Sequence, residues 1–343
     1  MRVGLIGYGA WGGIHATSIQ SLADHELVAI ACKSQDTARQ AQKNHPECQV
    51  TTDHLEILAR TDIDAVDIVV PNHLHVPFAA AALEAGKHVL LEKPMAPDVT
   101  AADRLVEAAQ KSDKSVSLIH ELRCSEQWSW LKNAIDRGDI GNPRYILLNL
   151  FRFPYRTGAD GWRYRPQEVG SWVLEEPIHF IDLMLWYFET TGAPTAVTAF
   201  TNPGEKDLSQ DFTAVFEFPT GAYGIVSQTL SAFEHHQVVE ISGSEGAIRS
   251  IWSGAMDRTD KPIFSITAQG RGEDTPVQIN LEYPSGEIFE IQENIRLALD
   301  GLAEGRSLYP VEKARNLVKL CLFAEQSARE HRRIELTMES SAF

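Results

Sequence analysis

The N-terminal stretch constrains the fold of this chain more than any other feature. A short apolar run, Val3–Ile6, continues into Gly7-Tyr8-Gly9-Ala10-Trp11-Gly12, a G-x-G-x-x-G sequence, and then into a helix-like segment that contains His15. A strand, a glycine turn and a helix in this order are what a dinucleotide-binding turn requires. Gly7 would permit the tight turn, Gly9 would let the backbone approach a pyrophosphate, and Gly12 would allow close packing of helix on strand.

Length and composition bound the class of protein. The 343 residues predict about two domains, and the net charge of −16 argues against a nucleic-acid partner. The four cysteines are far apart and form no C-x-x-C pair, so we expect neither a metal site nor a disulfide framework. No signal-like segment precedes Val3 and no apolar run reaches the length of a membrane span. The sequence therefore predicts a cytoplasmic protein with no membrane partner.

Residues 1–120 alternate between short apolar runs and helix-like segments. The apolar runs are typical of strands buried on both faces. They are Val3–Ile6, Leu27–Ala31, Ala65–Val70, His88–Leu91 and Ser115–Ile119, and the helical segments are Gly13–Leu22, Asp36–Asn44, Leu55–Arg60, Val76–Ala85 and Ala101–Lys111. Such alternation predicts βαβ units in a doubly wound parallel sheet, and hence a dinucleotide-binding Rossmann domain over residues 1–120.

From about residue 121 the pattern changes to strands separated by Gly, Pro and Asn turns. The predicted strands are Arg144–Phe151, Thr195–Asn202, Ala214–Phe218, Ala222–Leu230, Gln237–Ser242, Ala247–Ile251 and Ile263–Ala268. The predicted helices are Leu131–Arg137, Ile178–Phe188, Ile288–Gly301 and Val311–His331. This pattern predicts an α/β domain with an antiparallel sheet over residues 121–343, whose last helices could pack back on the first domain.

The end of the second predicted strand bears on the choice of coenzyme. Twenty residues after Gly12, where an NAD site would place an acidic residue, the chain has Cys32, followed by Lys33 and Ser34. A cation and a hydroxyl suit a 2′-phosphate, so we favour NADP(H), with NAD(H) as the alternative. The competing interpretation is that Lys33 is an ordinary solvated lysine.

Polar motifs follow other predicted strands. Pro71-Asn72-His73-Leu74-His75 and Glu92-Lys93-Pro94 come where strands of such a sheet end, which is where ligands bind. Further on, His179 lies early in a predicted helix, after Glu175-Glu176-Pro177. A histidine near a carboxylate can accept a proton from an alcohol. Taken singly, Lys93 could be a surface lysine and His179 a satisfied core residue.

Together these motifs resemble the Gfo/Idh/MocA oxidoreductases. The matching stretches are Gly7-x-Gly9-x-x-Gly12-x-x-His15, Val69–His75, Ala85–Val89, Glu92-Lys93-Pro94, Gly161-Trp162-Arg163 and His179-x-x-Asp182, with a further fit around Ala314–Leu320. The resemblance covers essentially the whole chain. It implies hydride transfer between a nicotinamide and a carbon that bears a hydroxyl, on a sugar, sugar derivative or cyclitol. It also implies a C-terminal domain with a large open antiparallel sheet, through which a homodimer or homotetramer forms.

The resemblance also implies roles for individual residues. Lys93 would orient the reacting oxygen, His179 would be the general acid and base, and Glu175 stands where the family usually has an aspartate. The cofactor-binding residues would be Gly7, Tyr8, Gly9, Ala10, Trp11, Gly12, Cys32, Lys33, Ser34, Pro71, Asn72, His75, Glu92, Lys93, Trp162 and Arg163. Substrate contacts would come from Arg123, Arg156, Glu176 and His179.

The segment before His179 departs from the family pattern Asp-x-Gly-x-His, because it reads Glu175-Glu176-Pro177-Ile178-His179. Either Glu175 or Glu176 could face the substrate. The nearby arginines could contact a ligand or could neutralise the two glutamates. Two other functions have precedent in the family: a glycosidase that oxidises its substrate transiently with retained NAD, and a non-catalytic nucleotide sensor.

Overall fold

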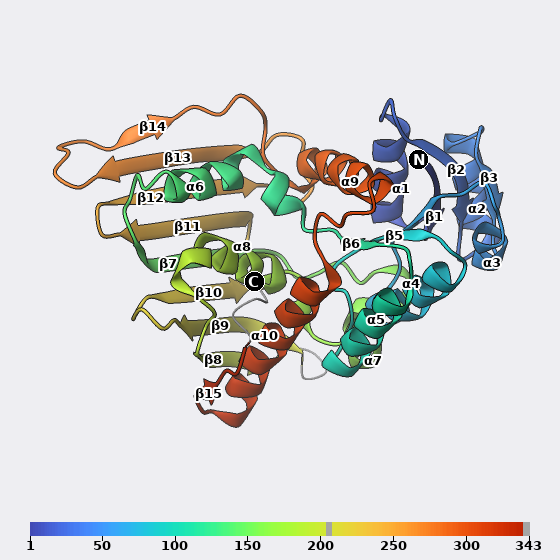
Figure 1. The fold of residues 1–343 in the computed structure, drawn as a ribbon. Coiled ribbons are helices and arrows are strands. Elements are labelled where there is room, and N and C mark those ends of the chain that lie inside the picture. Colours follow the sequence, from blue (N-terminus) through green and yellow to red (C-terminus); the bar gives the residue numbers. More distant parts are fainter. Residues whose placement is uncertain (204–207, 339–343) are drawn as a thin grey trace. The chain divides into compact units, whose positions relative to one another are not determined.

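The computed structural model describes residues 1–203 and 208–338. The chain divides into two compact units, each assembled from several stretches (Figure 1). Unit 1 comprises Met1–His120, Gly158–Gly170 and Ile291–Val318. Unit 2 comprises Glu121–Thr157, Ser171–Glu290 and the residues from Lys319 onward.

The sheet of unit 1 has six parallel strands in the order β3-β2-β1-β4-β5-β6. Its strands are β1 (Arg2–Ile6), β2 (Glu26–Ala31), β3 (Gln49–Thr51), β4 (Ala65–Ile68), β5 (His88–Leu91) and β6 (Val116–Leu118). The predicted doubly wound sheet is confirmed. The strand order reverses on either side of β1, and in such sheets ligands bind at the carboxyl ends beside this switch point.

Helices follow the strands of unit 1 as the alternating pattern predicts. They are α1 (Ala10–Gln20), α2 (Gln35–Asn44), α3 (His54–Leu58), η1 (Asn72–Leu74), α4 (His75–Glu84) and α5 (Val99–Lys111), with η3 (Ala159–Tyr164) and α7 (Pro166–Val169) from the middle of the chain. Helix α9 (Glu287–Ala303) also contributes, because Ile295 and Leu299 belong to the same buried cluster as Ile19 of α1.

The sheet of unit 2 has nine strands in the order β14-β13-β12-β11-β7-β10-β9-β8-β15. The strands are β7 (Pro143–Phe151), β8 (Ala196–Pro203), β9 (Ser209–Glu217), β10 (Tyr223–Thr229), β11 (His235–Gly243), β12 (Gly246–Gly254), β13 (Ile263–Gly270), β14 (Val277–Ile279) and β15 (Ile334–Glu335). The predicted antiparallel sheet is in fact mixed, since β7 and β10 pair in parallel. The connection after β7 includes α8, and the following meander of β8, β9 and β10 brings β10 back beside β7 in the same direction.

Helices α6 (Glu126–Asp136) and α8 (Pro177–Tyr187) cover one face of this sheet (Figure 1). Short turns η2 (Glu121–Cys124), η4 (Trp172–Leu174) and η5 (Glu189–Thr191) flank them, and α10 (Val311–Glu330) follows α9. A Cβ on Gly224 of β10 would lie 2.4 Å from Sδ of Met184, so this glycine allows α8 to approach the sheet closely. Within residues 1–203 and 208–338, no helix combines the length and the apolarity that a membrane crossing needs.

Candidate active site

The glycine turn after β1 fits a bound dinucleotide. Gly7 has φ +103°, and a Cβ there would lie 2.0 Å from the carbonyl oxygen of Val69. A Cβ on Gly12 would lie 2.1 Å from the carbonyl oxygen of Gly7, whereas one on Gly9 would meet no atom within 4 Å. Gly9 is the N-cap residue of α1 and offers no side-chain acceptor to the first N–H groups of the helix. An anion can approach the exposed backbone at Gly9 and Ala10.

The side chain of Tyr8 points away from this turn. Its hydroxyl lies 2.9 Å from Nε2 of His45 and accepts a hydrogen bond from Asn44, and its ring is buried in the core of unit 1. Only the backbone of Tyr8 is therefore available to a ligand at the turn.

At the end of β2, the three predicted coenzyme residues have different surroundings. Cys32 is buried, and burial raises the pKa of its thiol. Ser34 caps α2, since its hydroxyl accepts a hydrogen bond from the backbone of Thr37. Lys33 is exposed and forms an ion pair with Asp160, whose pKa is lowered chiefly by the hydrogen bond from Lys33.

The loops after β4 and β5 are joined by buried polar contacts. The ring nitrogens of His75 lie 2.6 Å from the carbonyl oxygen of Pro94 and 2.8 Å from that of Val70. Asn72 donates a hydrogen bond of 2.9 Å from Nδ2 to the carbonyl oxygen of Val169. The predicted residues Asn72 and His75 therefore hold neighbouring loops together inside unit 1, beside Pro71.

A buried charged network links α1 to the loop that carries Lys93. His15 of α1 lies 2.8 Å from Oδ2 of Asp67 on β4 and 3.0 Å from Oε1 of Glu92. Trp11 donates its indole N–H to the same oxygen of Glu92 at 2.7 Å, and the backbone N–H of Lys93 donates to the other oxygen at 3.0 Å. The Glu92 carboxylate thus fixes the backbone at Lys93.

Electrostatics determine the charge state of this network. Burial alone would lower the pKa of His15, but the charges and hydrogen bonds of Asp67 and Glu92 outweigh it and raise the pKa to about 10. Burial would likewise raise the pKa of Glu92, yet His15 and the charge of Lys93 lower it to about 2. An imidazolium therefore lies between the two carboxyl groups at neutral pH.

The segment Gly158–Gly170 belongs to unit 1, although its neighbours on both sides belong to unit 2. Trp162 is buried, and the guanidinium of Arg163 lies 4.8 Å from its ring centre. Trp162 packs on Gly158, where a Cβ would lie 2.4 Å from the indole nitrogen. The predicted cofactor residues Trp162 and Arg163 are thus in the same unit as the glycine turn.

In unit 2, His179 lies in the first turn of α8, which begins at Pro177. Its Nε2 lies 3.7 Å from Oε1 of Glu121, and both side chains are almost completely buried. Asp182, one turn later, accepts two hydrogen bonds of 2.7 Å from Arg123. The structure therefore gives His179 a buried carboxylate partner that the sequence did not identify.

Glu175 and Glu176 are both buried. Glu176 accepts a hydrogen bond of 2.6 Å from Arg152, whose guanidinium also contacts Asp257 at 3.2 Å. Arg156 binds Asp257 through both of its terminal nitrogens, at 2.6 and 2.7 Å. Arg152, rather than Arg156 or Arg123, therefore neutralises Glu176.

Two residues that contact predicted site residues, Glu121 and Arg152, could have been identified from the sequence. Glu121 follows the last apolar strand of the Rossmann pattern, where a parallel strand ends and a ligand site is expected. Arg152 belongs to the arginine-rich stretch before the two glutamates. Asp160 carries no comparable sequence signal, because its partner Lys33 is 127 residues away.

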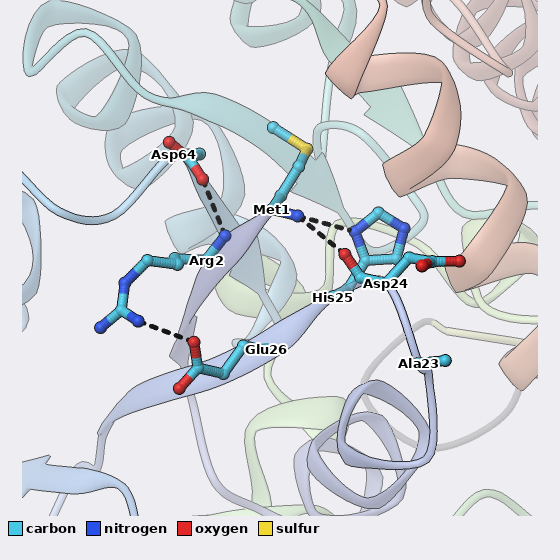
Figure 2. A pocket seen from close by; sticks show the side chains of 7 residues that line it. All are labelled: Met1, Arg2, Ala23, Asp24, His25, Glu26 and Asp64. Carbon is cyan, nitrogen blue, oxygen red and sulfur yellow. Dashed lines mark hydrogen bonds and ion pairs between the residues drawn. The ribbon is translucent and has the colours of Figure 1, made fainter.

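A hollow of about 350 Å³ at the opposite end of unit 1 is not a candidate site (Figure 2). Its lining side chains bond one another: Arg2 binds Glu26 at 2.7 Å, and the N-terminal amino group lies 3.2 Å from Nδ1 of His25. It lies at the amino ends of β1 and β2, whereas the glycine turn follows the carboxyl end of β1.

The sequence matches known protein families and relatives. The family model "Oxidoreductase family, NAD-binding Rossmann fold" matches residues 1–120, and "GFO/IDH/MocA C-terminal domain" matches residues 128–249. Inositol 2-dehydrogenase 4 of Saccharopolyspora erythraea is 34% identical in an alignment of 281 residues that covers 77% of this chain and 81% of that protein. Myo-inositol 2-dehydrogenase of Thermotoga maritima is 27% identical over 253 residues, covering 72% and 74% of the two chains.

Solved structures share the fold along nearly the whole chain. The aldose-aldose oxidoreductase of Caulobacter crescentus has a TM-score of 0.83 at 19% identity, covering 98% of this chain and 99% of that one. Levoglucosan dehydrogenase, in complex with NADH and levoglucosan, has a TM-score of 0.81 at 22% identity, covering 98% and 100%. The glycine turn, the two-sheet fold and the sequence matches agree, and the chain belongs to the Gfo/Idh/MocA family of NAD-binding oxidoreductases.

Proposed function

We propose that this protein is an NAD(P)-dependent dehydrogenase or reductase that acts on a hydroxyl-bearing carbon of a sugar, sugar derivative or cyclitol. The observation that carries the proposal is the 34% identity over most of the chain to a protein named for inositol oxidation. Other relatives and fold neighbours are named for anhydrofructose, aldose and levoglucosan chemistry. Polyols and their carbonyl forms are what these names have in common.

The bound nicotinamide would supply or accept the hydride. The turn at Gly7, Gly9 and Gly12 would hold the pyrophosphate, with Trp162 and Arg163 as further contacts from unit 1. We propose that Lys93 hydrogen-bonds the reacting oxygen and orients it, because Glu92 fixes the backbone there. The lysine would then stabilise negative charge that develops on that oxygen.

We propose His179 as the general acid and base. Its imidazole would take the hydroxyl proton during oxidation and return it during reduction, and the nearby Glu121 carboxylate would stabilise the imidazolium form. Glu175 is proposed as the substrate-facing carboxylate, because it stands where the family usually has an aspartate, whereas the Glu176 carboxylate is bonded to Arg152. Arg123 and Arg156 are proposed substrate contacts. Arg123 would bind substrate while bonded to Asp182, and Arg156 while bonded to Asp257.

For the coenzyme we propose a preference for NADP(H), supported by Lys33 and by the absence of an acidic residue at Cys32. We also propose that two or four copies assemble through the open face of the nine-stranded sheet, and that the protein works in the cytoplasm.

The proposed function is tested by screening sugars and cyclitols for NAD(P)H absorbance change with both coenzymes. Lys93→Ala and His179→Ala should each lower kcat/KM for the best substrate by about a hundredfold or more. Lys111→Ala, an exposed lysine in the same unit as Lys93, is the control and should leave the rate unchanged.

Three results would contradict the proposal. Nearly full activity in both alanine variants would exclude the proposed acid–base roles. Bond cleavage without net NAD(P)H change, with coenzyme retained, would identify a glycosidase. Coenzyme binding with no turnover on any polyol would favour a sensor.

A further inference from the structure

A carboxylate reaches the end of β2 from a distant part of the chain. Rossmann sites for NAD usually place an acidic residue near this point, where it binds the ribose 2′-hydroxyl. In this chain the position is Cys32, which is buried. Asp160 instead pairs with the adjacent Lys33 across 127 residues of sequence, and both belong to unit 1.

We propose that Asp160 is a coenzyme-specificity residue, because its carboxylate competes with a coenzyme 2′-phosphate for Lys33 and favours a coenzyme with a 2′-hydroxyl. The inference rests on the proposed contact of Lys33 with NADP(H). The ammonium group of Lys33 carries a single positive charge, which cannot neutralise both anions. When phosphate binds Lys33, the displaced carboxylate faces a like charge, which opposes binding. A 2′-hydroxyl can donate a hydrogen bond to the same carboxylate without such repulsion.

The backbone holds Asp160 in place. Its φ is +58°, a left-handed conformation that aspartate tolerates better than most residues. The carbonyl oxygen of Asp160 accepts a hydrogen bond from Arg165, and Trp162 packs on Gly158 two residues before Asp160. The same segment is tied to the loop after β4 by the hydrogen bond from Asn72 to Val169. The carboxylate is therefore presented by an anchored segment.

The local charges balance when Asp160 is present. Arg165 pairs with Glu168, and Lys33 pairs with Asp160, so these four side chains sum to zero. Replacing Asp160 by asparagine removes one negative charge and takes the carboxylate partner away from Lys33. A coenzyme with an additional phosphate should then bind more tightly than one without it.

The experiment measures NADPH and NADH binding by calorimetry, without substrate, for the wild-type chain, Asp160→Asn, Lys33→Ala and the double variant. Asparagine also tolerates a left-handed backbone, so Asp160→Asn should fold normally. It should raise the NADPH-over-NADH affinity ratio about threefold to tenfold. Lys33→Ala should lower the ratio about tenfold or more.

Asp113→Asn is the matched control. Asp113 is another exposed aspartate with a lysine partner, and it precedes β6, the edge strand on the other side of β1 from β2. The Asp113→Asn substitution removes the same negative charge and should leave the NADPH-over-NADH affinity ratio unchanged.

The outcomes separate this inference from the proposed coenzyme preference. An unchanged ratio in Asp160→Asn, with a lowered ratio in Lys33→Ala, overturns the role of Asp160 alone. An unchanged ratio in Lys33→Ala overturns the proposed NADP contact. If Asp160→Asn raises the ratio equally in the Lys33→Ala background, competition for Lys33 is wrong.

Discussion

Gly7, Gly9 and Gly12 meet different surroundings although they belong to one turn. Side chains at positions 7 and 12 would collide with backbone carbonyl oxygens at 2.0 and 2.1 Å, so these glycines are required by the fold itself. Gly9 has a φ of −84°, which any residue can adopt, and open space where its Cβ would be. The space beside Gly9 is therefore available to a ligand.

This contrast predicts different consequences for two small substitutions. Gly9→Ala should keep the wild-type Tm, because its methyl group meets no protein atom, but should weaken NAD(P)H binding about tenfold or more by blocking the close approach of the pyrophosphate. Gly12→Ala should lower the stability by about 1–3 kcal/mol through the backbone collision. Thermal melts and calorimetric titrations check both, and unweakened coenzyme binding in Gly9→Ala would show that the ligand does not approach at this glycine.

Glu175 and Glu176 are adjacent, yet their substitution should have separable effects. Glu176→Gln leaves the buried Arg152 guanidinium with Asp257 as its remaining carboxylate and should cost about 1–3 kcal/mol in the free energy of unfolding. Glu175→Gln should lower kcat/KM about tenfold or more, because Glu175 is the proposed substrate-facing carboxylate. Urea unfolding measures the change in stability of both variants, and steady-state kinetics measures the change in kcat/KM. A larger loss of kcat/KM in Glu176→Gln than in Glu175→Gln would mean that Glu176 faces the substrate.

At the scale of elements, the buried network of Asp67, His15 and Glu92 connects β4, α1 and the loop after β5. The folded pKa of His15, about 10, lies above the ordinary 6.5. Its stabilising contribution is therefore complete below pH 6.5 and is lost as the pH rises toward 10. The folded protein should lose stability over this range because it must hold a proton that the unfolded chain has released.

His15→Gln should remove this dependence. Between pH 6.5 and 10 the wild-type free energy of unfolding should fall by about 2–5 kcal/mol more than that of His15→Gln. Urea unfolding across the pH range measures the difference, with His54→Gln, a more exposed histidine of unit 1, as the control. Parallel pH curves for wild type and His15→Gln would mean that His15 is not charged in the folded state.

Sequence predicted the strands that have buried apolar residues, including the short β6, and missed the short, more exposed strands β3 and β14. Burial on both faces gives β1 and β5 continuous apolar runs, which are recognisable without a partner strand. Strand β3 is short and has no fully buried residue, and β14 is short and mostly exposed, so neither carries such a run. The parallel pairing of β7 with β10 was also missed, because alternation within a strand does not identify its neighbour.

In the candidate site, too, some features could be predicted from the sequence and others depend on the fold. The glycine turn could be recognised because its function is encoded in consecutive residues. Lys33 was identified as a candidate cation, but its bond to Asp160 depends on the fold bringing together residues that are far apart in sequence. Likewise, Arg152 was one of several arginines until the structure showed which of them contacts Glu176.

At the scale of the whole molecule, the chain passes between its two units after residues 120, 157, 170, 290 and 318. Unit 1 therefore needs sequence from three separate stretches. The division into domains of residues 1–120 and 121–343 remains a prediction. Substitutions in α9 can test it, because most of this helix belongs to unit 1. Its residues Ile295, Leu299 and Leu302 are fully buried in a cluster with strands β1 and β2 and helix α1.

A fragment of residues 1–120 should consequently fail to unfold in one cooperative transition, because removing α9 exposes the apolar face of α1. In the full chain, Leu299→Ala should cost about 2–5 kcal/mol, since its side chain is completely buried. Leu308→Ala is the matched control: Leu308 is in the same unit and 42% exposed, so its loss should change stability by less than about 0.5 kcal/mol. Urea unfolding, monitored by circular dichroism, measures the stability of the fragment and of the two variants. A sharp transition in the fragment, with a stability close to that of the full chain, would show that residues 1–120 form a complete folding unit and that α9 is dispensable to it.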